Sequence, residues 1–381
     1  MIRSAIVVVV LAVFSPSPLA LADEAVLNLG PEEFVRLDGN DIVVPGYSVP
    51  SFEDWNGDQL KDLVVGEGGN SFTGKVRVYL NRGTEADPCF TDYSYVRADG
   101  RDLTCIPQGC LGAFPRVVYW DEDERKDLLV GLGDGTVKIF LNVASDNEPA
   151  FDAGTFVTVG SETVLNLDVG ARATPVPVDW NNDGLLDLVA GAADGAIRIY
   201  LSSLDGSLVP GSVPGLLVPG QRSSPVILDL DGDGNKDLLT GNTDGQILFC
   251  RNIGLDSQPT FSGYFFVQSA GKPIDLSGTG RSRPFVCHWT GDGHLGAKDG
   301  YWDLLVGYGD GKVHLYRGLP KRGDFDADGD LDADDFTFIA RALDKPIPPG
   351  GTPADLNDDA VVDVTDLRLF AALWLAANGA E

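Results

Sequence analysis

The chain has 381 residues and a formal net charge of −29, with 57 acidic residues against 28 basic ones. This acidity argues against nucleic acids and anionic membrane surfaces as partners, because both are bound by basic patches. Glycine is abundant, at 47 residues, and helical periodicity is almost absent before residue 330. The composition therefore predicts a mainly β protein of short strands separated by turns.

Residues 1–22 have the pattern of a secretory signal peptide. Arg3 gives a basic start, residues 6–14 are apolar, and Ala-Leu-Ala at 20–22 is a small-residue cleavage motif. The apolar run is shorter than the ~20 residues that span a bilayer, and no later stretch competes with it. We therefore expect a secreted or cell-surface chain without a membrane span; a retained N-terminal anchor is the alternative.

The chain has five cysteines, and the compartment into which it is expected to be exported permits disulfides. Cys89, Cys105 and Cys110 lie on one connection, and we expect two of them to pair. Cys250 and Cys287 lie in strand-like segments, either as buried thiols or as a second bridge.

Five similar modules follow one another between residue 24 and about residue 318. Each has a small residue, Pro two positions later, an acidic loop, an apolar strand such as "DLLVG", and an alternating strand such as "VRVYLN". In four modules an Asp-Gly pair joins the last two strands, as a hairpin turn requires. One further strand is expected upstream of each Pro. The prolines are Pro50, Pro115, Pro175, Pro225 and Pro284, and the further strands often start near Phe34, Phe90, Phe151 and Phe261.

Each module is therefore predicted to be a four-stranded antiparallel sheet of about 50–65 residues, the size of a propeller blade. The apolar run suits an inner strand covered on both faces, and the alternating run suits an outer strand with one wet face. Closing the modules into a ring removes exposed sheet edges. The predicted fold is a five-bladed β-propeller over residues 23–319, followed by a small all-α domain over 320–381. An elongated β-solenoid and a degenerate extra blade between residues 83 and 112 are the alternatives.

The acidic loops place oxygen-bearing side chains at positions 1, 3, 5 and 9, with a backbone carbonyl available at position 7. Ca²⁺ takes 6–8 such hard oxygen ligands, whereas Mg²⁺ keeps several waters and zinc prefers histidine and cysteine. Asp, Asn and Gly also favour plain solvated turns, but a recurrence at fixed phase favours calcium. The complete loops contain Asp54, Asn56, Asp58, Leu60 and Asp62 in module 1; Asp179, Asn181, Asp183, Leu185 and Asp187 in module 3; and Asp229, Asp231, Asp233, Asn235 and Asp237 in module 4.

Modules 2 and 5 depart from this pattern. Module 2 has Tyr119 at position 1 and keeps Asp121, Asp123 and Asp127, so we expect its site to be weakened or lost. Module 5 has His288 and Thr290 at positions 1 and 3, and an insertion before Asp303. Asp292 and Asp299 in that insertion are the open candidates for a ligand there.

The loop, the "DLLVG" strand and the "DG-V-V-Y-N" pattern recur in phase, and in this the modules resemble FG-GAP or VCBS repeats, the calcium-loop blades of integrin α-subunit propellers and of many secreted bacterial proteins. The resemblance implies calcium in each competent blade, where it holds strands in register rather than doing chemistry. Integrin propellers have seven blades, so the ring size is not carried over from them.

After residue 320 the chain carries two further acidic loops, each leading into a helical pattern. Phe336, Ile339, Ala340 and Leu343 share one predicted helix face, and Leu367, Phe370, Ala371 and Trp374 share another. Both helices are predicted to begin one residue after position 12; an acidic disordered tail is the alternative. The loop residues are Asp324, Asp326, Asp328, Asp330, Asp332 and Asp335, then Asp355, Asn357, Asp359, Val361, Asp363 and Asp366.

This duplicated pattern resembles the type I dockerin, a paired EF-hand-like module with Asp at position 12. The resemblance implies two more calcium ions, a cohesin-like partner and a polysaccharide-related assembly or cell surface. The family contacts cohesin through positions 10 and 11, here Ala333-Asp334 and Val364-Thr365, and these do not match each other. Ala360 stands where the bend favours glycine, so the second loop is expected to be the weaker site.

No nucleophile motif is present in the sequence. Glu53, Glu67 and Asp99 are carboxylates outside the loop pattern. His288, His294, Tyr301 and Trp302 cluster in the module 5 insertion, where packing is favoured over sugar stacking. The favoured function is a non-catalytic binding or adhesion propeller for a glycan or protein ligand. The alternative is a polysaccharide hydrolase or lyase.

Overall fold

The computed structural model describes residues 27–378, apart from 69–73, 106–111, 122, 161–162, 212–216, 262, 277, 279, 290–300, 321, 326–330, 344, 346–351, 353 and 358. The predicted signal peptide lies outside the described residues.

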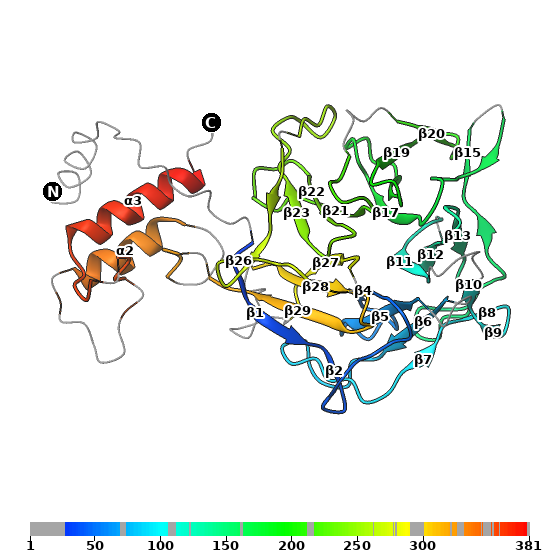
Figure 1. The fold of residues 1–381 in the computed structure, drawn as a ribbon, viewed down its shortest axis with the longest axis horizontal. Coiled ribbons are helices and arrows are strands. Elements are labelled where there is room, and N and C mark those ends of the chain that lie inside the picture. Colours follow the sequence, from blue (N-terminus) through cyan, green and yellow to red (C-terminus); the bar gives the residue numbers. More distant parts are fainter. Residues whose placement is uncertain are drawn as a thin grey trace.

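Five sheets of at least four strands form the body of the molecule (Figure 1). From the innermost strand outward they are β4 (Ser48–Glu53), β5 (Asp62–Glu67), β6 (Gly74–Tyr79) with β7 (Ser94–Tyr95) and β10 (Thr104–Cys105) in blade 1; β11 (Phe114–Val118), β12 (Asp127–Gly131), β13 (Val137–Phe140) and β14 (Thr155–Phe156) in blade 2; β17 (Thr174–Val178), β18 (Asp187–Gly191), β19 (Ile197–Ser202) and β20 (Leu208–Pro210) in blade 3; β21 (Ser224–Leu228), β22 (Asp237–Gly241), β23 (Ile247–Cys250) and β24 (Phe265–Phe266) in blade 4; and β27 (Arg283–Cys287), β28 (Asp303–Gly307), β29 (Val313–Gly318) and β1 (Leu29–Phe34) in blade 5.

Short strands extend the rim. The pair β15 (Thr158–Val159) and β16 (Leu165–Asn166) continues blade 3, and the pair β25 (Gln268–Ser269) and β26 (Lys272–Pro273) continues blade 5. Two small hairpins are formed by β2 (Arg36–Leu37) with β3 (Asn40–Asp41) and by β8 (Arg97–Ala98) with β9 (Arg101–Asp102).

The five innermost strands close a ring. β4 contacts β11, β11 contacts β17, β17 contacts β21, β21 contacts β27, and β27 contacts β4. The prediction of a five-bladed propeller is confirmed. The connection 83–112 supplies β7 and β10 to the edge of blade 1, so among the described residues it forms no sixth blade.

In blades 1 to 4 the fourth strand comes from the chain segment that follows the third strand. Blade 5 is completed by the N-terminal strand β1, which pairs antiparallel with β29 and sets Phe34 opposite His314. The further strand predicted upstream of each Pro therefore belongs to the preceding blade, and its assignment to the same module was wrong. As a result, the Pro-containing strand is innermost and the alternating strand is third. This offset joins the two ends of the ring, so that β29 is not left as an open edge.

The module motifs make the contacts between blades. At the end of "DLLVG", a Cβ on Gly131 would lie 2.1 Å from the carbonyl oxygen of Ala173 and 2.5 Å from Pro175 Cδ in the next blade. Gly66, Gly241 and Gly307 meet the small-x-Pro segment of the next blade equally closely, at 2.1–2.3 Å. Glycine and the small residue before Pro are thus two sides of one packing contact that recurs around the ring.

Gly131→Ala is expected to destabilise the propeller by about 1–3 kcal/mol, because backbone on the facing blade must move to admit the methyl group. Gly30→Ala is the matched control, since the nearest atoms to its Cβ are 3.5 Å away or more. Urea melts of both variants measure the difference. Equal losses would contradict the packing assignment.

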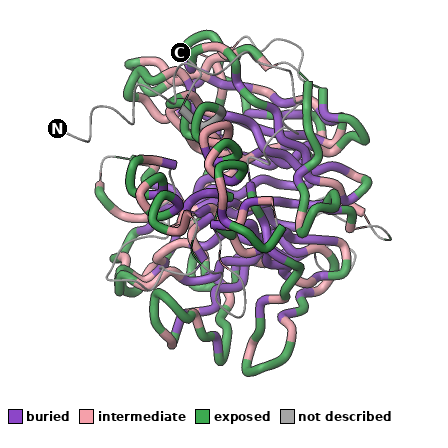
Figure 2. The backbone as a smooth tube through the Cα atoms, turned by 90° about the vertical axis from the view of Figure 1, so that its left-hand side faces the viewer, coloured by how far each residue is buried: buried purple, intermediate pink, exposed green. Residues whose placement is uncertain are grey.

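The hydrophobic core is divided among the blade interfaces. Leu128 and Val130 of β12 pack in the cluster shared with blade 1, and Leu129 between them packs in the cluster shared with blade 3. Buried segments accordingly gather in the interior strands, and exposed segments lie in the loops around them (Figure 2). A strand covered on both faces explains the unbroken apolar run, as predicted.

His314 on β29 holds the closing strand β1 in place. Its Nδ1 lies 2.7 Å from Glu32 Oε1, and its Nε2 lies 3.4 Å from Asp310. Burial acts to lower the pKa of His314, but hydrogen bonds to Asp310 and Glu32 outweigh it and raise the pKa above 6.5. The folded chain therefore binds this proton more tightly than the unfolded chain does.

This shift predicts a pH-dependent closure of the ring. The contribution of His314 to stability is fully present below its unfolded pKa and is lost as pH rises through the higher folded pKa. The stability difference between wild type and His314→Gln should therefore be largest at pH values below 6.5 and should shrink as the pH rises through the higher pKa of folded His314. Thermal melts at several pH values measure it, and a constant difference would contradict the assignment.

The described cysteines do not form the predicted bridge. Cys89 and Cys105 are free thiols, and Cys110 lies outside the described residues. Cys250 and Cys287 are free and buried, in agreement with the buried-thiol alternative. Burial raises the pKa of Cys250 to about 12.

Two helices follow the propeller, α2 (Ala333–Ala342) and α3 (Val364–Asn378), and they pack on each other (Figure 1). Within the described residues, no helix combines the length and the hydropathy needed to cross a bilayer.

Candidate metal centres

The acidic loop of each blade joins its innermost strand to its second strand, and in blades 1, 3 and 4 it has one repeated geometry. In blade 4, Asp229 at position 1 accepts N–H bonds from Gly232 (2.8 Å) and Gly234 (2.9 Å). Asp231 and Asp233, at positions 3 and 5, each accept from the N–H two residues further on. The equivalent acceptors are Asp54, Asn56 and Asp58 in blade 1 and Asp179, Asn181 and Asp183 in blade 3, and the position-5 side chains accept from the N–H groups of Leu60 and Leu185.

These bonds curl the loop back on its first residue. The bend needs left-handed backbone, found at Gly184 (φ 84°) and Gly234 (φ 88°) and, in blade 1, at the non-glycine Gln59 (φ 72°). The local order of Asp, Asn and Gly is therefore sufficient to form the loop.

The oxygen ligands converge most clearly in blade 4. Carboxylate oxygens of Asp229, Asp231 and Asp237 all lie within 4.8 Å of one another. Burial, together with the nearby charges of Asp231 and Asp233, raises the pKa of Asp237 to about 6. Arg251 offsets part of this negative charge, with Nε 2.7 Å from Asp231. A set of hard oxygens at this spacing fits Ca²⁺ and, lacking histidine and cysteine, does not fit zinc.

The aspartate at position 9 has a second role that the spacing did not predict. It is buried in every blade and accepts one N–H from position 2 of its loop and one from the segment at the end of the third strand. For Asp127 these donors are Trp120 (3.1 Å) and Asn142 (2.8 Å). The equivalent aspartates are Asp62, Asp187, Asp237 and Asp303.

We call this pair of hydrogen bonds to one buried aspartate a clamp. It joins the loop to the sheet whether or not the other oxygen-bearing residues of the loop are present. Asp127 and Asp303 keep it in the two modules whose other positions have diverged. Their retention in the sequence was the available indication of a role beyond metal binding.

In blade 2 an arginine occupies the loop. Arg125 forms an ion pair with Asp123 and donates Nε–H to the carbonyl oxygen of Asn142 at 2.6 Å. Among the described residues, only the N–H of Asp123 donates to Asp121, and Tyr119 at position 1 is 56% exposed. A guanidinium thus supplies, in this loop, the positive charge that a cation would supply in the complete ones.

The blade 5 loop is only partly described. His288 stacks on Trp302 with ring centroids 4.2 Å apart, and its Nδ1 lies 2.9 Å from the carbonyl oxygen of Tyr301. These contacts are of the packing kind that was favoured for the insertion. Thr290, Asp292, His294 and Asp299 lie outside the described residues.

The two C-terminal loops share a hydrogen-bond pattern of their own. Asp335 and Asp366, both at position 12 and fully buried, accept N–H bonds from positions 2 and 9 of their loops. In the second loop Asp355 accepts from Asp359 and Ala360, as position 1 does in the propeller. Asp326, Asp328 and Asp330 of the first loop lie outside the described residues.

Both helices begin at position 10, three residues earlier than predicted. In the first, Asp332 at position 9 is the N-cap and forms a capping box with Asp335, which starts the helix there. The predicted helix faces are also only partly buried: Ile339 and Phe370 are in the core, whereas Phe336 is 40% and Trp374 is 44% exposed.

Ala360 has a left-handed backbone (φ 67°), as the loop pattern predicts. Ala360→Gly should stabilise the tail by about 1 kcal/mol by removing the contact between Cβ and the carbonyl oxygen. Slower hydrogen exchange of the α3 amides would show this gain. Ala371→Gly, in α3 itself, is the control and should have the opposite sign.

A five-bladed β-propeller with an acidic loop in each of at least four blades is the class of protein that these observations define. A family model described as FG-GAP-like repeat matches residues 179–240, which include the complete loops of blades 3 and 4. No curated protein matches the chain in sequence.

Several solved structures are similar to this chain at low identity. A Tc holotoxin pore of Photorhabdus luminescens is 14% identical over 77% of this chain, with a TM-score of 0.38, and this chain spans only 15% of it. An Agrocybe aegerita lectin that recognises non-reducing terminal N-acetylglucosamine is 20% identical over 73% of this chain and 67% of its own, with a TM-score of 0.38. BBS1N in complex with ARL6DN is 11% identical over 78% of this chain and 98% of its own, with a TM-score of 0.39.

Proposed function

We propose that the chain is an exported calcium-binding propeller that acts as a non-catalytic binding or adhesion module. The observation that carries the proposal is the hydrogen-bonded loop geometry shared by blades 1, 3 and 4, together with the carboxylate oxygens of Asp229, Asp231 and Asp237, which lie within 4.8 Å of one another in blade 4. Calcium there would hold the first two strands of each blade in register. Export rests on the signal-peptide pattern of residues 1–22.

The tail is the proposed point of attachment. Its two loops duplicate the position-12 clamp, and this favours a type I dockerin that binds two calcium ions and a cohesin-like partner. Exposed apolar side chains on the helices and between them, among them Phe336, Val364 and Trp374, offer a surface for such a partner. Tyr301 of blade 5 donates a hydrogen bond to Asp324, the first residue of the first tail loop, so tail and propeller are in contact.

The ligand of the propeller is proposed to be a glycan or a protein in a polysaccharide-related setting. Glu67 is one of the candidate carboxylates for the enzyme alternative. It forms a buried ion pair with Arg77 at 2.7 Å, and this argues against a catalytic role. Glu53, another candidate, is half-buried, and desolvation is the main cause that raises its pKa.

Purified full-length protein on a glycan array, with calcium and with EDTA, tests the binding proposal. Calcium-dependent binding without release of reducing sugar is expected. Turnover that one carboxylate substitution outside the loops abolishes, such as Glu53→Gln, would establish the enzyme instead.

A further inference from the structure

Arginine recurs at one position of the blade repeat, three residues before the Pro. Arg172, Arg222 and Arg281 occupy it in blades 3, 4 and 5, and Tyr47 and Gly112 occupy it in blades 1 and 2. The position lies at the start of the innermost strand, whereas the acidic loop follows the end of that strand. The five residues of the strand, at about 3.3 Å each, separate the arginine position from the acidic loop. The arginines therefore lie on the opposite face of the ring from the acidic loops.

In blades 2 to 5 the backbone at this position is left-handed, a conformation that favours glycine. Arg172 has φ 59°, Arg222 φ 57° and Arg281 φ 79°, and Gly112 has the same conformation at φ 59°. A side chain there is strained relative to glycine, because its Cβ crowds the following carbonyl oxygen. Three blades nevertheless carry arginine, and strained residues of this kind concentrate at functional sites.

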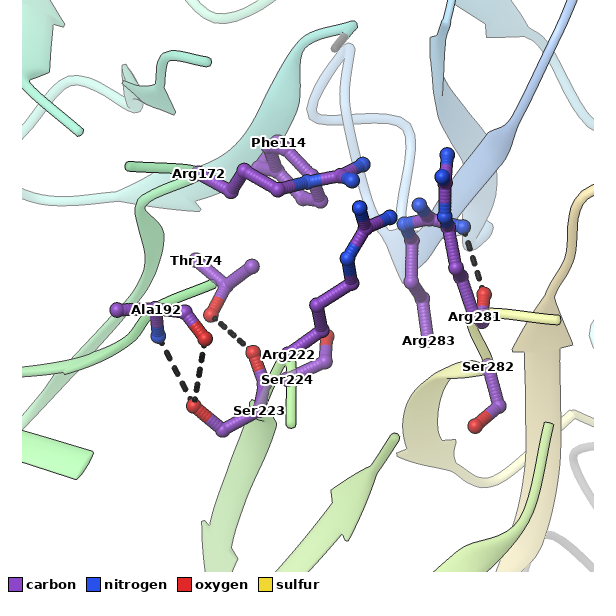
Figure 3. Close-up of a pocket in the computed structure, with 10 residues that line it drawn as sticks. All are labelled: Phe114, Arg172, Thr174, Ala192, Arg222, Ser223, Ser224, Arg281, Ser282 and Arg283. Atoms are coloured by element: carbon purple, nitrogen blue, oxygen red, sulfur yellow. Dashed lines mark hydrogen bonds between the residues drawn. The ribbon is translucent and has the colours of Figure 1, made fainter. Parts of the chain in front are cut away.

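The arginines meet in a cavity of about 20 Å³. Its lining comes from the inner strands of four successive blades, so it lies at the centre of the ring. Arg172, Arg222 and Arg281 are joined there by Arg283, and Figure 3 shows the guanidinium groups gathered on one side of the cavity. A space of this size admits a water-sized group, such as one oxygen of an anion.

Neighbouring aromatic rings hold the guanidinium groups. The Tyr47 ring centroid is 4.5 Å from Arg281 Cζ and 4.7 Å from Arg283 Cζ, and the Tyr47 hydroxyl accepts a hydrogen bond from Arg281. Arg283 also lies over Phe114, at 5.5 Å. Planar guanidinium groups held in this way are preorganised for the oxygens of an anion.

The lining is positively charged in a chain of net charge −29. The described lining residues include four arginines and no carboxylate. Burial, and then the charges of Arg172, Arg281 and Arg222, lower the pKa of Arg283 well below its ordinary value. The buried hydroxyl of Ser224, which also lines the cavity, has no hydrogen-bond partner among the described residues.

We propose that this cavity is an anion-binding site, in which the arginines and Ser224 bind the oxygens of a sulfate, phosphate or carboxylate group. The group is either a free ion or the acidic substituent of a polysaccharide. An anion there would relieve the mutual repulsion of the arginines and supply an acceptor for the Ser224 hydroxyl. The site is independent of the metal loops, so it stands or falls separately from the proposed calcium-binding function.

The test is a thermal-melt titration of the full chain with sodium sulfate, in calcium and at ionic strength matched with sodium chloride. A saturable rise in melting temperature is expected for wild type. Arg222→Gln should weaken the sulfate affinity roughly tenfold or more, because a charge-assisted bond is lost. In chloride alone the same variant should melt at or above the wild-type temperature, because it removes like-charge repulsion.

The matched control is Arg317→Gln on β29, where Arg317 is 40% exposed and pairs with Glu33 outside the cavity. It should respond to sulfate as wild type does. Ser224→Ala serves as a second variant should Arg222→Gln fail to fold, and it too should bind sulfate more weakly. Dextran sulfate and neutral dextran then distinguish the sources: stronger binding of the sulfated polymer than of free sulfate indicates a polysaccharide substituent, and equal binding indicates a free ion. No saturable effect of sulfate in wild type, or an equal effect in wild type and both cavity variants, would overturn the proposal.

Discussion

Chelating calcium from the full-length protein is expected to lower its melting temperature markedly. A ligand that binds only the folded state adds about 2.7 kcal/mol per site at a hundredfold excess over Kd. Three complete propeller loops and two tail loops would each contribute, so the combined loss is large beside a total stability of about 5–15 kcal/mol. Calorimetric melts in millimolar calcium and in excess EDTA measure the difference.

Single substitutions separate the loops from one another. Asp183→Ala in blade 3 should remove one calcium-dependent increment, because its loop has a complete ligand set. Asp123→Ala in blade 2 should leave the calcium response unchanged, because Arg125 already occupies that loop as the partner of Asp123. Bound calcium counted by elemental analysis gives an independent measure. An unchanged melt in EDTA, or equal calcium responses for the two variants, would refute the metal assignment.

Asp127→Ala is expected to destabilise the propeller by roughly 2–5 kcal/mol, because it leaves the buried N–H of Asn142 and the part-buried N–H of Trp120 without an acceptor. The loss should be the same in calcium and in EDTA, since the loop of blade 2 lacks its first ligand. Urea unfolding in both buffers checks this.

Asp121→Ala in the same loop is the matched control, since Asp121 is exposed and, within the described part of the chain, accepts one bond from inside the loop. Its effect should stay within about 0.5 kcal/mol. If the cost of Asp127→Ala disappeared in EDTA, position 9 would act through a metal alone, and the clamp would have no structural role.

The parts of the molecule that follow from short-range order were predictable. The loop geometry of Asp229 to Asp237 is formed by bonds between residues two to five positions apart, and such bonds are encoded in local spacing. The unbroken apolar run of β12 correctly indicated a strand covered on both faces. Ala360 was recognisable as a left-handed position because the first tail loop has glycine there.

The prediction was wrong for strands that pair in one blade but directly precede the next blade in the chain. The strands upstream of each Pro were recognised as strands and assigned to the wrong sheet, since periodicity records strand character and not the strand's partner. The helix starts were predicted late because the capping box between Asp332 and Asp335 was not weighed.

Composition, spacing and repeat phase therefore established the repeating blade, its acidic loops and the duplicated tail, because each of these depends on residues close together in the chain. The contacts between residues far apart in the chain were decided by the closure of the ring. It brings Glu32 to His314 across 282 positions, and it gathers arginines from three blades into one cavity. Neither contact leaves a local periodicity, because each depends on where the ends of the inner strands meet in space.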